Sequence, residues 1–97
     1  MFKFFITFDL KNAQGWYDDF YAKAITLGLT PYIPGKYVES GDDIDLPNTT
    51  LYGVLISDNQ EKAKNLMSQK VKSIYTSLNL NGRFTVICSE GSYTENL

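Results

Sequence analysis

A run of aromatic and β-branched residues opens the chain, and it constrains the fold more than any other feature of the sequence. Residues 2–8 read FKFFITF, a composition typical of a strand at the centre of a sheet, and the run stops at Asp9. Successive side chains of a strand point to opposite faces of its sheet. One face would therefore carry Phe2, Phe4, Ile6 and Phe8, and the other Lys3, Phe5, Thr7 and Asp9.

Helical and strand patterns alternate along the rest of the chain. Apolar residues recur at helical spacing over 15–28 and 58–78, and Asp58 is the predicted N-cap of the second helix. Strand patterns occupy 30–40, 50–56 and 83–88. The order strand, helix, strand, strand, helix, strand predicts an α+β fold of the ferredoxin-like βαββαβ type, in which two helices cover one face of a four-stranded antiparallel sheet.

The composition bounds the size and the setting of the protein. With 97 residues, 43% of them hydrophobic and 14% aromatic, the sequence predicts a single domain over 1–97 with a flexible tail at about 89–97. No window approaches the roughly 18 consecutive apolar residues of a membrane span, so no membrane partner is expected. Cys88 is the sole cysteine, which excludes an intramolecular disulfide and favours a reducing, cytoplasmic setting.

The charged and titratable residues exclude several kinds of chemistry. The net charge is −2, so the chain has no long-range positive field that would gather nucleic-acid phosphates. Histidine is absent, which removes the usual general base and the commonest transition-metal ligand. Any catalysis would have to use carboxylate, lysine, tyrosine or serine side chains.

The two helices would leave the second face of the sheet uncovered. Phe5 is predicted to lie on this face. Its neighbours there would be one of Leu55 and Val54 and one of Ile87 and Val86. An uncovered apolar face in a protein of this size normally docks onto another surface. A homodimer is the simplest solution, because a two-fold interface needs only one self-complementary patch.

A turn-rich acidic loop over 41–49 separates two of the predicted strands and is longer than a hairpin needs. The spacing of Asp42, Asp43 and Asp45 superficially resembles a calcium loop. The required glycine and bidentate glutamate are missing, so a solvated acidic loop is the better interpretation. Reversing all three charges to lysine is then predicted to leave the fold intact and to weaken the capture of a basic partner.

The sequence around Asp9 resembles the start of one known family group. A strand of the form apolar-apolar-Thr-Phe-Asp-Leu is followed by a short polar loop and a helix with Tyr17, Phe20 and Leu27-Gly28. Over residues 2–29 this pattern resembles the small CRISPR adaptation endonuclease-like proteins, the virulence-associated D toxins and their small relatives. The resemblance implies a domain that pairs through its sheet, with Asp9 of two copies holding magnesium or manganese for phosphodiester cleavage. Interpreted without the resemblance, Asp9 is a strand-end residue that bonds its own loop.

Two interpretations of the function stay open. In the first, the chain is a small cytoplasmic protein-binding module, phage or mobile-element encoded or toxin-related, that needs no cofactor. Its contacts with a basic or nucleic-acid-binding partner would come from Phe5, Trp16, Asp42, Asp43 and Asp45. Trp16 would be a surface anchor in that case, and a core residue otherwise. In the alternative, the chain is a metal-dependent endoribonuclease or endonuclease with Asp9 as the catalytic metal ligand.

Overall fold

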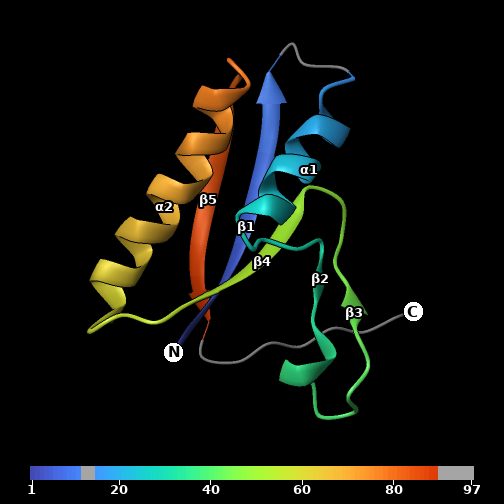
Figure 1. Cartoon of the computed structure of the whole chain (residues 1–97), viewed down its shortest axis with the longest axis vertical. Coiled ribbons are helices and arrows are strands. Elements are labelled where there is room, and N and C mark those ends of the chain that lie inside the picture. Colours follow the sequence, from blue (N-terminus) through green and yellow to red (C-terminus); the bar gives the residue numbers. More distant parts are fainter. Residues whose placement is uncertain (12–14, 90–97) are drawn as a thin grey trace.

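A computed structural model describes residues 1–11 and 15–89 of the chain. The elements form a mixed α+β fold, which confirms the predicted class, and the main sheet is antiparallel (Figure 1). In this sheet β1 (Phe2–Lys11) lies between β4 (Thr50–Leu55) and β5 (Asn81–Ser89). The helices α1 (Tyr17–Thr26) and α2 (Gln60–Ser77) both pack on one face of the sheet.

The centre of the core is β1, and the alternation predicted for it is confirmed. Phe4 and Ile6 are fully buried on the helix side, whereas Thr7 and Asp9 are exposed on the other face. Burying a large apolar side chain stabilises a fold by about 1.5–3 kcal/mol relative to leaving it exposed. The residues that join β1 in the core are Phe20, Ala24, Leu29, Leu51, Ala63, Met67, Val71, Ile74 and Tyr75.

An aromatic cluster connects both helices to the sheet. Phe20 of α1 stacks on Phe8 of β1 at 4.4 Å between ring centroids, and it meets Tyr75 of α2 edge to face at 5.2 Å. Tyr75 in turn stacks on Phe84 of β5 at 5.8 Å. Aromatic pairs in these geometries add about 0.5–1.5 kcal/mol each beyond the area they bury. The cluster therefore fixes the positions of α1 and α2 over β1 and β5.

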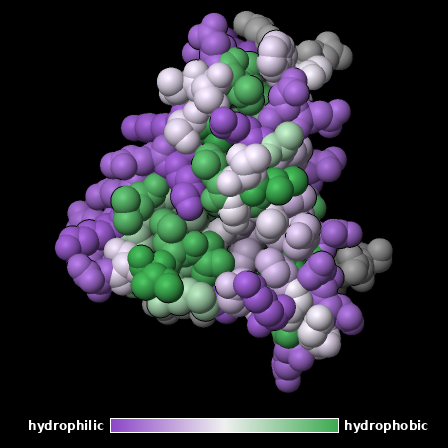
Figure 2. Space-filling model, viewed as in Figure 1, coloured by the Kyte–Doolittle hydropathy of each residue, from purple (hydrophilic) through white to green (hydrophobic). Residues whose placement is uncertain are grey.

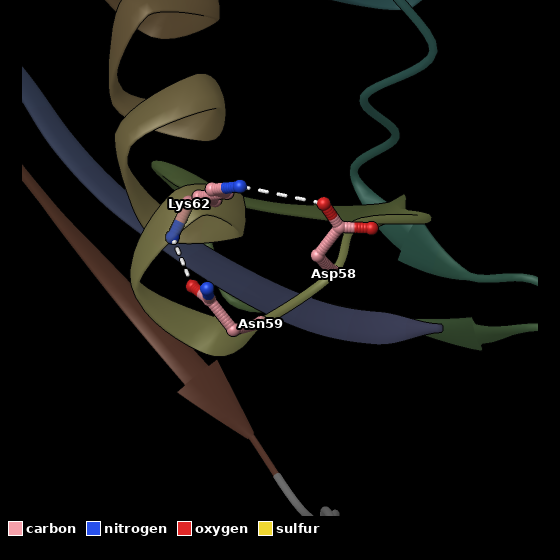
Figure 3. Close-up of polar contacts among 3 residues, drawn as sticks. All are labelled: Asp58, Asn59 and Lys62. Carbon is pink, nitrogen blue, oxygen red and sulfur yellow. Dashed lines mark hydrogen bonds and ion pairs between the residues drawn. The ribbon is translucent and has the colours of Figure 1, made fainter.

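The N-terminus of α2 is capped one residue later than the sequence predicts (Figure 3). Asn59 has extended backbone angles, and its side-chain oxygen accepts a hydrogen bond from the Lys62 N–H at 2.9 Å. Asp58, the predicted cap, instead forms an exposed ion pair with the Lys62 ammonium at 3.3 Å. Asn and Asp are equally good caps, so the backbone conformation at Asn59 decides between them.

The segment predicted as a strand over 30–40 leaves the sheet after a single residue. The Thr30 N–H donates to the Tyr52 carbonyl at 2.9 Å and the Tyr52 N–H donates back at 2.7 Å. Proline has no N–H to donate, so Pro31 and Pro34 prevent the ladder from continuing. The chain instead forms β2 (Tyr32–Ile33), the 3-10 helix η1 (Gly35–Tyr37) and β3 (Ile44–Asp45). In the described residues the main sheet thus has three strands, and β2 and β3 form a second sheet.

The structure also moves the ends of the predicted elements by one or two residues. After α1, Gly28 has φ 83°, a left-handed conformation that favours glycine, and its N–H donates to the Ile25 carbonyl at 3.0 Å.

Of the tail predicted over 89–97, Ser89 ends β5 and the other positions lie outside the described residues. Within the described ranges, no helix has the length and apolar character to cross a membrane.

Candidate functional site

The segment between Thr30 and β4 forms a small unit beside the sheet, called here the acidic protrusion (residues 31–46). Its two strands pair Tyr32 with Asp45 and Ile33 with Ile44. The Leu46 N–H donates to the Pro31 carbonyl at 3.0 Å and closes the unit at its base. Figure 1 shows it standing beside β4 on the side away from α2. The predicted acidic loop is therefore partly ordered by strand pairing.

Tyr37 attaches the acidic protrusion to the open face of the main sheet. Its ring lies 6.0 Å from that of Tyr52, and the ammonium groups of Lys3 and Lys36 lie 5.3 and 5.1 Å from its centroid. Tyr52 is only 2% exposed, although it belongs to the face that the helices leave bare. Burial raises the pKa of Tyr52 above its usual value, and the nearby Tyr37 adds to the shift. The acidic protrusion thus covers the β4 side of the open face.

The three aspartates of the acidic protrusion have different roles. The carboxylate of Asp43 accepts a hydrogen bond from the Gly35 N–H at 2.6 Å and so joins the two arms of the unit. Asp42 and Asp45 are exposed, and Asp45 belongs to β3. In the described part of the chain, the one ion pair is that between Asp58 and Lys62. Asp42 and Asp45 are therefore available to a basic partner, while Asp43 is a structural residue.

Asp9 bonds across the sheet, and it does not end its strand as predicted, because β1 continues to Lys11. The loop to which its side chain was predicted to bond includes residues 12–14, which lie outside the described residues. The carboxylate of Asp9 accepts a hydrogen bond from the Arg83 N–H of β5 at 2.9 Å. Its backbone carbonyl accepts one from the Tyr75 hydroxyl at 2.8 Å. Burial raises the pKa of Tyr75 to about 12, with smaller contributions from the charges of Asp9 and Tyr17. The described residues include no cluster of three or more His, Cys, Asp or Glu side chains that could hold a metal ion.

The contact with Arg83 predicts a small effect for the substitution Asp9→Asn. Asparagine keeps a side-chain oxygen that accepts the Arg83 N–H, so we expect a change in unfolding free energy of less than about 0.5 kcal/mol. Asp9→Ala removes the acceptor and should cost about 1 kcal/mol. Urea unfolding of the three proteins measures both values. A melting temperature that rises with magnesium or manganese in the parent but not in Asp9→Asn would instead support the metal-dependent nuclease.

The rest of the open face is less apolar than the sequence predicts. The strand register places Tyr52, Phe5 and Ile87 in one row across the three strands. Ile87 is 48% exposed, while Phe5 is half-buried beside Tyr52 at 5.3 Å between ring centroids. The next row across the sheet consists of Thr50, Thr7 and Thr85. Of the two residues predicted beside Phe5 on β4, Val54 lies on the open face, opposite Lys3, and is partly buried. The uncovered apolar surface therefore consists of Phe5, Ile87 and Val54, and the face-to-face homodimer stays a prediction.

Trp16 lies at the surface, which rules out its interpretation as a core residue. It precedes α1 as the N-cap residue, makes no side-chain capping bond, and is 46% exposed. Trp16 borders an open hollow of about 560 Å³ at the end of β1 and the start of β5. The other described residues that line this hollow are Lys11, Leu78, Asn79, Leu80 and Asn81.

An exposed apolar patch at the opposite end of the sheet escaped the sequence reasoning. Ile56 is 88% exposed, and Met1 and Leu66 are also largely exposed. Figure 2 shows hydrophobic side chains gathered beside the first half of α2. Two positions in the sequence explain this exposure. Ile56 follows the last paired residue of β4, and Leu66 precedes the buried Met67 by one residue, which places it about 100° away around the helix.

No protein-family model, curated protein or solved structure matches the chain. The resemblance of residues 2–29 to the CRISPR adaptation endonuclease-like and virulence-associated D proteins therefore stays a prediction.

Proposed function

We propose that the protein is a binding module whose acidic protrusion docks onto a basic surface of another protein. The observation that carries this proposal is the concentration of charge on residues 31–46. Four carboxylates and one lysine give this unit a net charge of −3, and none of the four forms an ion pair within the described chain. Complementary charge speeds encounter with a basic partner and selects against acidic ones. The carboxylates are those of Glu39, Asp42, Asp43 and Asp45.

The acidic protrusion is held in one conformation by its own contacts, which supports a binding role. Tyr37 packs on Tyr52, Asp43 accepts from Gly35, and β2 pairs with β3. A disordered acidic loop would lose conformational entropy when it bound, at a cost of about 1–2 kcal/mol for each residue that became ordered. A surface that is already ordered avoids most of this cost. Proteins that bind nucleic acid are a suitable partner class, because their contact surfaces are rich in Lys and Arg.

We also propose that the fold is a shortened ferredoxin-like arrangement. Thr30 exchanges both backbone hydrogen bonds with Tyr52 on the outer side of β4, where the fourth strand of that arrangement would lie. The order of the remaining strands, β4, β1 and β5, and the two helices on one face fit the same arrangement. The free, partly buried Cys88 fits a cytoplasmic setting, where thiols stay reduced.

Neutralising Asp42 and Asp45 tests the binding role. We expect the double variant Asp42→Asn with Asp45→Asn to bind a fluorescent arginine-rich peptide at least about fivefold more weakly than the parent, measured by anisotropy at physiological salt. Asp43 is left unchanged because its carboxylate accepts a hydrogen bond from the Gly35 N–H. We therefore no longer expect that all three aspartates can be replaced without a loss of stability. Circular dichroism should show an unchanged fold.

A matched control separates a local effect from a change in net charge. Asp18 and Asp19 are exposed in the first turn of α1, so Asp18→Asn with Asp19→Asn changes the net charge equally at a distant place. We expect this control to weaken peptide binding less than about twofold at physiological salt, where charges further apart than about 8 Å are screened. Equal weakening by both double variants, or no peptide binding by the parent, would contradict the proposal.

A further inference from the structure

The two outer edges of the main sheet differ in how they are covered. On the β4 edge, Thr30 occupies the backbone groups of Tyr52, and the acidic protrusion stands beside it. On the β5 edge, no strand of the described chain pairs with the outer side of residues 81–88. A row of unpaired N–H and C=O groups on a sheet edge is a template for a further strand.

The sequence of β5 lacks the features that usually prevent such pairing. Its residues 84–89, FTVICS, contain no charge, no proline and no glycine. The strand is nine residues long, and its single charged residue, Arg83, lies near its beginning. Protected edges are short, or carry lysine, proline or a bulge. Six-residue uncharged segments of high β-propensity are the ones that pair most readily when exposed.

The apolar side chains of β5 are incompletely covered on both faces of the sheet. Phe84, Val86 and Cys88 face α2 and are only partly buried. Their partners across the ladder on β1, which are Phe8, Ile6 and Phe4, are buried. On the other face Ile87 is half-exposed. A strand added beside β5 would therefore bury apolar surface as well as backbone groups.

We infer that β5 pairs with the β5 of a second copy of this chain, antiparallel about a two-fold axis near Val86. A two-fold axis across an edge makes the pair antiparallel automatically, and it requires only that β5 complement itself. This condition is met, because Arg83 of each copy falls toward the far end of the other strand and the middle of the pair is uncharged. The two three-stranded sheets then become one continuous sheet.

The acidic protrusion stays free in this dimer, since it stands at the opposite edge of the sheet. The dimer would carry one acidic protrusion at each outer end. Two linked copies bind a partner that has two basic patches more tightly than one copy does, without any new contact. The pairing of β5 does not depend on the proposed binding role, and either can fail without the other.

Two substitutions that differ only in strand position test the inference. Thr7 and Thr85 are exposed on the same face and lie directly opposite each other, but Thr7 belongs to the central strand and Thr85 to the edge. Thr85→Lys should raise the dimer dissociation constant at least about tenfold, because two lysines then lie close to the axis. Thr7→Lys should raise it less than about twofold, which sedimentation velocity across a concentration series measures.

The same pair of variants separates the edge from the open face as the dimer surface. If the copies met face to face, Thr7→Lys would disrupt the dimer as strongly as Thr85→Lys, and this result would overturn the inference. Amide hydrogen exchange adds a second measurement, since exchange within residues 84–88 should slow as the concentration of the parent rises. A parent that stays monomeric at every concentration would leave the edge to a strand of a different protein and would also overturn the inference.

Discussion

Replacing Gly82 with alanine is expected to destabilise the fold by about 3 kcal/mol or more, the upper end of what overpacking costs. A Cβ at this position would overlap the backbone carbonyl oxygen of Asp9 and would lie 2.9 Å from Cε1 of Tyr75. The Asp9 carbonyl also accepts the Tyr75 hydroxyl, so it cannot shift without breaking that bond. Urea unfolding followed by circular dichroism measures the loss.

Gly53 provides the matched control for this substitution. A Cβ there would lie 2.5 Å from Cδ2 of Leu29 and 2.9 Å from Cε of Met67, which are the ends of side chains and not backbone atoms. Such ends can adjust by rotation, so we expect Gly53→Ala to cost about 1–2 kcal/mol. If Gly53→Ala costs as much as Gly82→Ala, the close approach of Asp9 is not what requires glycine at position 82.

Truncation of Phe20 to alanine is the second change with a large expected effect, a loss of about 3–5 kcal/mol. The ring is fully buried and contacts Phe8 and Tyr75, so its removal leaves a cavity where α1, α2 and β1 meet. Domains of this size are typically stable by about 5–15 kcal/mol, so the variant loses a large part of its stability and should unfold at a lower temperature than the parent. Thermal and urea unfolding both report the change.

The control for Phe20 lies on the same helix. Ile25 belongs to α1 but is largely exposed, so Ile25→Ala should change the free energy of unfolding by less than about 0.5 kcal/mol. The difference between the two variants isolates burial from helix propensity, because both changes introduce alanine into the same helix. Similar losses in the two variants would show that α1 does not pack as described.

The elements that sequence reasoning predicted well are those with a strong local pattern. The alternation in β1 identified its buried face because the helices cover one side of a central strand and leave the other to solvent. The apolar face of α2 was predicted from its helical spacing, and Ala63, Met67, Val71 and Ile74 are buried. Leu66 was predicted to lie on the same face, but it is 49% exposed. A hydrophobic period of 2 or 3.6 residues is a property of a single strand or helix, so it can be recognised in the sequence without knowing which elements pack against it.

The features that sequence reasoning missed depend on contacts between distant segments. The residues 32–33 pair with 44–45 and not with β4, and a pairing choice of this kind leaves no periodic signal. In the candidate site, Asp43 and Asp42 look alike in the sequence, but only Asp43 reaches the Gly35 N–H. Asp9 was identified as a notable position, while its partner, Arg83, lies 74 positions away in the chain. Composition and spacing cannot show which carboxylate is already occupied.

The position of β1 between β4 and β5 has a consequence for synthesis of the protein in the cell. Leu10 lies opposite Gly82, so one side of β1 can be paired only after the ribosome has added 72 further residues. Until then the most aromatic strand of the chain has an open edge, and incompletely folded chains of this kind associate readily with chaperones or with each other. A translational pause between α2 and β5 would prolong this stage. The yield of native protein should therefore fall when slow codons are placed over residues 78–82.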